Sequence, residues 1–131
     1  MADIAIEDAT KTEWDLIALP GGMPGANHLR DSEALNEILT KQKDTGKPYA
    51  AICAAPAVVL AEKGMLGEGA TCYPAPQFRA KLNNPVDDAV SVTGQVTTSK
   101  GPGTALEFAL SLGEQLFGKE VRDNIEKEML L

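Results

Sequence analysis

A cysteine stands at the junction between an expected strand and an expected helix. The apolar run Tyr49–Ile52 ends at Cys53, and Pro56 falls in the first turn of the helix that should follow. The positive end of a helix dipole and its unpaired N–H groups stabilise a thiolate. Ala54 and Ala55 are small enough for the sharp turn of a nucleophile elbow. The pattern predicts a nucleophilic thiol, although spacing alone favours a small buried apolar residue equally.

Two glycine-containing turns are expected at the same edge of the sheet, because ligands of open α/β sheets bind beyond the carboxyl ends of the strands. Gly21 and Gly22 follow an apolar run at residues 16–19 and can bring backbone N–H groups close enough to hold an oxyanion. Gly101 and Pro102 lie in the turn at residues 99–104. That turn either holds an anion or simply connects a strand tightly to a helix.

Other residues of reactive type are weaker candidates. Cys72 is expected to pack as a small apolar residue, and its pairing with Cys53 stays open because a sequence gives no Cα separation. His28 is expected in an exposed loop, and Asp87 and Asp88 in a solvated one. With two cysteines, no CxxC pair and one histidine, we expect neither a disulfide framework nor a metal or other cofactor.

The composition is that of an ordinary globular protein. The chain has 131 residues, of which 44% are hydrophobic and 24% charged, and we expect one domain over residues 1–131. A net charge of −7 argues against nucleic acid and anionic membranes as partners. No apolar run is long enough for a membrane span and no signal pattern opens the chain, so a cytoplasmic location is expected, with an organelle left open.

Strand-like and helix-like segments alternate along the chain. Strands are expected at residues 16–19, 49–52 and 70–73, with a hairpin at 90–92 and 96–98 and a weak strand at 4–6. Helices are expected from a cap at Asp31 or Ser32 to Gly46, from Pro56 to Gly64, and over residues 120–131. A capping box at residues 104–107 opens another helix, whose inward residues would be Ala109, Leu112 and Leu116. This alternation predicts an α/β fold with a largely parallel sheet.

Three motifs in order resemble the DJ-1/ThiJ/PfpI superfamily, and the DJ-1 and YajL branch in particular. They are residues 19–22 (LPGG), residues 51–56 (AICAAP) and residues 99–104 (SKGPGT), the last followed by Glu107-Phe108-Ala109. The resemblance runs from about Glu7 to Ile125. It implies a flavodoxin-like (class I glutamine amidotransferase-like) three-layer sandwich with a mostly parallel sheet, commonly in a homodimer.

The resemblance also implies a function and a site. Cys53 would be the reactive cysteine, with oxyanion and substrate contacts from Gly21, Gly22, Ala54, Tyr73, Gly101 and Pro102. The family activities are cofactor-independent glyoxalase and deglycase reactions on small carbonyls such as methylglyoxal, redox sensing through cysteine oxidation, and chaperone-like protection under oxidative stress. A peptidase or amidotransferase is disfavoured because Ala54 rather than histidine follows the cysteine. A truncated form without activity of its own is a further alternative.

Two departures from the family pattern stand out. Family members begin with a strand–helix–strand section that places a protonated glutamate against the cysteine, and this chain starts after that section, so neither Glu7 nor Glu13 takes that role. We therefore expect the chain to form homo-oligomers or to bind the missing segment. Tyr73 stands where the DJ-1 branch often has histidine. Its hydroxyl can bond a substrate carbonyl, but a phenol is not a base near neutral pH.

Overall fold

The computed structural model describes all 131 residues and contains one four-stranded sheet in the order β1-β2-β4-β3. The strands are β1 (Ile17–Leu19), β2 (Tyr49–Ile52), β3 (Val90–Thr93) and β4 (Val96–Ser99). The first two and β4 are parallel, and β3 pairs antiparallel with β4 as the edge of a hairpin. Ile52 is the register partner of Ser99, so the ends of β2 and β4 lie side by side. The expected strands at 16–19 and 49–52 and the hairpin are confirmed.

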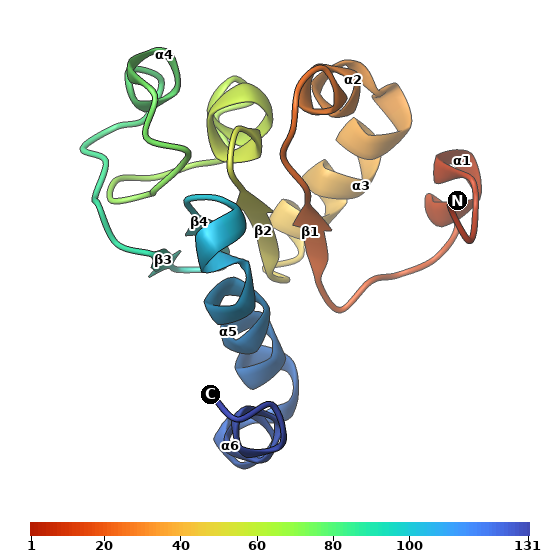
Figure 1. The fold of residues 1–131 in the computed structure, drawn as a ribbon. Helices are drawn as coiled ribbons and strands as arrows, with labels where there is room; N and C mark the ends of the chain where they lie inside the picture. The colour runs from red at the N-terminus through yellow and green to blue at the C-terminus, as the bar shows by residue number, and fades with distance from the viewer.

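Helices cover both faces of the sheet (Figure 1). One face carries α2 (Gly25–Asp31), α3 (Glu33–Asp44) and the π-helical segment η1 (Pro56–Ala61), with the short helices α1 (Ile6–Ala9) and α4 (Pro76–Arg79) at its margins. The other face carries the 3-10 turn η2 (Pro102–Thr104) and α5 (Ala105–Phe117), while α6 (Lys119–Glu128) packs on α5 at a distance from the sheet. The predicted three-layer α/β arrangement is confirmed.

Apolar side chains explain the two layers of packing. The larger core lies between the sheet and the layer formed by α3 and η1. Leu39, Val59 and Leu60 are fully buried there. On the other face, Phe108 and Leu112 of α5 pack against Ala50. Because β2 is central and buried on both sides, its sequence is a continuous apolar run rather than an alternating one.

Helix α3 begins at the predicted cap. The Ser32 side chain accepts a hydrogen bond from the Leu35 N–H at 3.2 Å, which satisfies one of the free donors of the first turn. Helix α2 was missed, because Gly25-Ala26-Asn27-His28 has the composition of a loop. Ala26 is fully buried against Ala54 and Val58, so packing rather than propensity makes this segment helical. His28 is exposed as predicted, but on a helix.

The weak strand expected at residues 4–6 is wrong, since Ile6 begins the short helix α1. The strand expected at residues 70–73 is also wrong, because this segment pairs with no strand in the sheet. Helix α5 begins after Thr104 as expected, but the Thr104 hydroxyl makes no cap hydrogen bond to it. Thr104 instead bonds Ser99 and Gly101.

The inward face of α5 also differs from expectation. Leu112 is buried, whereas Ala109 and Leu116 are exposed. Ala109 faces a shallow apolar groove beside α6, which Ile125 and Met129 also line. The second buried residue of α5 is Phe108, one turn before Leu112, so the face that meets the sheet is rotated from the one predicted. No helix is long and apolar enough to cross a membrane.

Candidate active site

Cys53 occupies a strained turn between β2 and η1. Its φ angle is +66°, a left-handed conformation that is uncommon for a residue with a side chain and that concentrates at functional sites. Two backbone hydrogen bonds hold the turn: the Cys53 N–H donates to the Ser99 carbonyl at 3.0 Å, and the Cys53 carbonyl accepts from the Tyr73 N–H at 2.8 Å. The side chain is half-buried. This is the geometry expected of a nucleophile elbow.

The Gly21–Gly22 turn lies directly against the cysteine. A Cβ at Gly21 would stand 2.5 Å from the Cys53 Cβ and 3.1 Å from its sulfur, so only glycine permits this approach. Gly22 has a φ of +85° and open space around it. The two glycines are therefore required for different reasons, the first for space and the second for backbone conformation.

Backbone N–H groups with no acceptor in the chain lie at this junction, those of Gly22 and Ala54 among them. Neither the Gly22 N–H nor the Ala54 N–H donates a hydrogen bond within the chain. Ala54 is buried, and a buried unpaired donor carries an energetic cost unless something accepts from it. The oxyanion of an adduct at Cys53 would be such an acceptor.

The Gly101–Pro102 turn lies next to Tyr73, since a Cβ at Gly101 would stand 3.5 Å from the Tyr73 ring. Its backbone donors are already used or absent. The Gly101 N–H donates to Thr104 Oγ1 at 3.1 Å, and proline has no N–H. Of the two interpretations open from sequence, the geometry favours a tight strand-to-helix connection. The turn borders Tyr73, and a contact of Gly101 or Pro102 with substrate stays a prediction.

Tyr73 is exposed at the same edge and its ring is held by neighbours. Phe78 of α4 meets it edge-to-face, with ring centroids 6.4 Å apart at an interplanar angle of 78°. The backbone hydrogen bond to Cys53 places Tyr73 beside the elbow. The structure thus brings Gly21, Tyr73 and Gly101 around the cysteine turn.

Cys72 has a different environment from Cys53. It is fully buried with Ala57, Ala70 and Leu82, and its thiol contacts the Tyr73 carbonyl at 3.3 Å. Burial raises the pKa of the Cys72 thiol, with the charge of Arg79 opposing that effect and Cys53 adding to it. The two cysteines are free thiols. Cys72 packs in the core while Cys53 borders the Gly21 turn.

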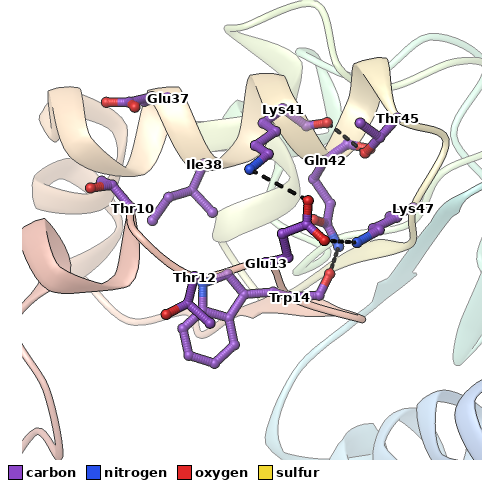
Figure 2. Close-up of a pocket in the computed structure, with 10 residues that line it drawn as sticks. All are labelled: Thr10, Thr12, Glu13, Trp14, Glu37, Ile38, Lys41, Gln42, Thr45 and Lys47. Atoms are coloured by element: carbon purple, nitrogen blue, oxygen red, sulfur yellow. Dashed lines mark hydrogen bonds and ion pairs between the residues drawn. The ribbon is translucent and has the colours of Figure 1, made fainter.

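Cys53 does not line the cavity drawn in Figure 2, the apolar cavity beside β1 or the groove beside α6. The cavity drawn in Figure 2, of about 140 Å³, lies between α3 and the segment before β1. Glu13 there reaches both Lys41 and Lys47, at 3.9 and 3.7 Å, and the Gln42 amide donates to the Trp14 carbonyl at 3.0 Å. These polar groups hold the chain before β1 on α3, at the end of the sheet opposite to Cys53. No group of three or more His, Cys, Asp or Glu side chains is arranged to hold a metal ion.

Sequence reasoning missed the hydroxyl side chains that support the site. The buried Ser99 donates from Oγ to the Ala89 carbonyl at 2.7 Å and lies 2.6 Å from Thr104 Oγ1, while its carbonyl holds Cys53. Thr98 Oγ1 accepts from the Thr71 N–H at 3.0 Å. The run Thr97-Thr98-Ser99 at the end of a buried strand was the available signal, because hydroxyls buried in a core need partners.

The fold and the site define a three-layer α/β protein with a cysteine on a strained strand–helix turn that a glycine pair faces. The model of the DJ-1/PfpI family matches residues 1–115, and the chain belongs to that family. It is 42% identical over its whole length to Protein DJ-1 homolog B of Arabidopsis thaliana, of which it covers 30%. It is 37% identical to Glutathione-independent glyoxalase DJR-1.2 of Caenorhabditis elegans, with 98% of this chain and 69% of that protein covered.

Solved structures agree with the fold. Toxoplasma gondii DJ-1 in an oxidized form is 45% identical with a TM-score of 0.89, and the match covers 98% of this chain and 71% of that one. The chain thus spans 30% of the length of the Arabidopsis protein, 69% of the Caenorhabditis elegans protein and 71% of the Toxoplasma gondii protein. The flavodoxin-like architecture implied by the motifs is confirmed.

Proposed function

We propose that the chain is a Cys53-dependent, cofactor-independent protein of the glyoxalase or deglycase type that acts on small reactive carbonyls such as methylglyoxal. One observation carries the proposal: a half-buried thiol sits on a strained turn against the Gly21–Gly22 turn, and the N–H groups of Gly22 and Ala54 have no acceptor in the chain. The relative named a glutathione-independent glyoxalase supports the same reaction class.

The proposed chemistry is addition followed by isomerisation. The Cys53 sulfur bonds to the aldehyde carbon, the carbonyl electron pair moves to oxygen, and the Gly22 and Ala54 N–H groups stabilise that oxygen until it is protonated. The proton on the former aldehyde carbon then moves to the neighbouring carbonyl carbon, while the hydroxyl of the adduct loses its proton and the oxygen of the neighbouring carbonyl gains one, which leaves a thioester. Water hydrolyses the thioester to a 2-hydroxy acid and releases the thiol. One water is consumed and no oxidant is needed.

The test is turnover of methylglyoxal by the chain and by two matched variants. Cys53→Ser should abolish turnover, whereas Cys72→Ser, which changes the buried thiol, should retain it. Turnover that survives in Cys53→Ser would overturn the assignment of the nucleophile.

A second candidate function is redox sensing or protection through oxidation of Cys53. The difference in burial between the two thiols favours it, because peroxide can reach the half-buried Cys53 more readily than the enclosed Cys72. In that reaction peroxide oxidises the thiolate to a sulfenic acid, and a second equivalent gives the sulfinic acid. Peroxide-dependent gain of oxygen mass at Cys53 without carbonyl turnover would favour the sensor over the enzyme.

We also propose that the chain associates through the open side of β1, either with another copy or with the strand–helix–strand segment of the family. The support is that β1 is the outermost strand and has a ladder partner only in β2. An apolar cavity of about 460 Å³ adjoins it, lined entirely by hydrophobic residues that include Trp14, Leu16 and Ile17. Unpaired strand edges next to apolar surface favour association. Sedimentation at several concentrations tests this, and a monomer throughout would contradict self-association.

A further inference from the structure

The segment from Gly69 to Tyr73 is fastened to the sheet by side chains rather than by a ladder. Ser91 Oγ donates to the Gly69 carbonyl at 2.7 Å, and the Thr71 N–H donates to Thr98 Oγ1 at 3.0 Å. The hydroxyl groups of β3 and β4 thus take the place of the backbone partners that a strand would have used.

The attachment at Thr98 is enclosed. Thr98 is 1% exposed and Thr71 is fully buried, so no water replaces the Thr98 oxygen if it is removed. The Thr71 hydroxyl has no hydrogen-bond partner of its own. The Thr98 hydroxyl is therefore the only side-chain acceptor that holds this stretch against β4.

Two residues further along, the segment reaches the site. Cys72 anchors its middle in the core with Ala57 and Leu82, and the Tyr73 N–H donates to the Cys53 carbonyl. The Tyr73 ring meets Phe78 edge-to-face and lies next to Gly101. A shift of the backbone at Thr71 is transmitted through the buried Cys72 to both the Tyr73 ring and the Cys53 carbonyl.

We infer that Thr98 is a positioning residue, whose hydroxyl fixes Tyr73 beside Cys53 by holding the Thr71 N–H. One part of the inference, that Tyr73 contacts the substrate carbonyl, rests on the proposed function. The placement of Tyr73 itself is independent of that function, so the two are tested separately.

Thr97 provides a matched control. It is the neighbour of Thr98 on β4, is equally buried at 1% exposure, and also accepts one hydrogen bond, from the Gln115 amide of α5 at 2.9 Å. Its side chain serves the opposite layer. Thr97→Val and Thr98→Val therefore remove the same chemical group from the same strand, but only Thr98→Val releases the segment that carries Tyr73.

The first measurement is hydrogen exchange of the Tyr73 amide by NMR in the 131-residue chain. Thr98→Val should raise the ratio of the Tyr73 exchange rate to the exchange rate of the β2 amides roughly tenfold, because local opening of the segment becomes easier while the sheet stays closed. Thr97→Val should leave the ratio unchanged, and Thr98→Ser, which keeps the hydroxyl, should behave like the parent. Equal effects of Thr97→Val and Thr98→Val would overturn the inference. If Thr98→Val does not fold, accelerated Tyr73 exchange in Thr98→Ser would overturn it as well.

The second measurement is a double-mutant cycle on carbonyl turnover with Tyr73→Phe. Thr98→Val should lower kcat/KM in the parent and in the Tyr73→Phe background, and the factor lost in the parent should be about five times the factor lost in Tyr73→Phe. A coupling of this size is in the range seen for residues that act together. Thr97→Val should cost the same factor in both backgrounds. Independent effects of Thr98→Val and Tyr73→Phe would overturn the link to catalysis. Absence of turnover in the parent would instead refute the proposed function, and the exchange measurement would still decide the position of Tyr73.

Discussion

Gly21 lies so close to Cys53 that a methyl group on its Cα would stand 2.5 Å from the cysteine Cβ and 3.0 Å from the Ile52 carbonyl oxygen. Neither atom can move aside cheaply, since one belongs to the strained elbow and the other to the backbone of β2. The β1–α2 turn and the elbow are therefore fitted to each other across the sheet edge, and a change in one must displace the other.

Gly21→Ala should consequently destabilise the chain by about 1–3 kcal/mol, the cost of overpacking a close contact. It should also slow alkylation of Cys53, because the elbow has to shift. Urea unfolding and iodoacetamide kinetics measure the two effects. Gly25→Ala is the control, since a Cβ at Gly25 meets nothing within 4 Å. Unchanged Cys53 reactivity in Gly21→Ala would contradict the fit described above.

Gly22 is expected to act through its backbone. Its φ of +85° disfavours any side chain by about 1–2 kcal/mol, and the strain of Gly22→Val would displace the unpaired Gly22 N–H. Turnover of methylglyoxal should then fall more than the melting temperature explains, when assayed well below that temperature. Parallel losses of activity and stability would show that Gly22 serves folding only.

Cys53 should be the fast-reacting thiol. It is half-buried on the elbow, whereas Cys72 is enclosed and burial raises the pKa of its thiol, so that less Cys72 thiolate is present at neutral pH. Limited iodoacetamide or peroxide treatment followed by peptide mass mapping should find modification at Cys53 first. Raising the pH should increase labelling of Cys72 only at pH values at which the chain begins to unfold, because the folded chain encloses this thiol. Equal or faster labelling of Cys72 in the folded chain would sink this prediction.

Tyr49 makes stability depend on alkaline pH. Its hydroxyl donates to the Met65 carbonyl at 2.6 Å, and burial raises its pKa above the ordinary value of 10.0. The folded state keeps the proton that the unfolded chain loses near pH 10, so this contribution is complete below that pH and is lost as the pH rises through the higher folded pKa. Tyr49→Phe should cost about 1 kcal/mol at pH 7.

The same variant should flatten the fall in unfolding free energy above about pH 10, the ordinary range of a tyrosine hydroxyl. Urea titrations of both proteins at several pH values between neutral and alkaline measure this difference. Identical slopes for the parent and Tyr49→Phe above that pH would rule out the titration of Tyr49 as the cause.

The parts of the fold that sequence predicted are those where pattern and packing agree. The buried run Tyr49–Ile52, the Ser32 cap and the hairpin at β3 and β4 each combine a hydrophobic pattern with local turn chemistry. Helix α2 and the segment at residues 70–73 failed because tertiary contacts decide them. Packing of Ala26 on Ala54 stabilises helix α2. The Thr71 N–H donates to the Thr98 hydroxyl instead of to the backbone of a neighbouring strand.

The candidate site follows the same rule. Cys53, Gly21 and Gly22 were recognisable as candidates from their places at strand ends, but spacing alone left a buried apolar cysteine equally open. The family resemblance decided between the two, and the structure brings these residues together. The role of Thr98 could not be read from sequence, because it depends on a hydrogen bond over 27 residues of chain. The sequence shows that Gly101 has a backbone N–H that could bind an anion. Only the structure shows that this N–H already donates to the Thr104 hydroxyl.

The last prediction concerns the acid that proton transfer needs. No carboxyl group hydrogen bonds to either thiol, since the only thiol hydrogen bond is that of Cys72 to a backbone carbonyl, and a positioned acid or base typically contributes about 10²–10⁴-fold to a rate. We therefore expect the 131-residue chain alone to add aldehydes at Cys53 but to turn them over slowly. Adding the strand–helix–strand section of the family, fused ahead of Met1 or as a separate chain, should pair β1 and supply the glutamate.

Two versions of that section separate its effects. With the glutamate, turnover and stability should both rise; with glutamine in its place, stability should rise alone, because strand pairing needs no acid. The comparison uses kcat for methylglyoxal and the midpoint of urea unfolding. High turnover by the chain alone, unchanged by either version, would show that another group of this chain supplies the proton to the oxyanion, with the Tyr73 hydroxyl as the candidate acid. In that case Tyr73→Phe should abolish turnover without the added section, which makes the source of the proton directly measurable.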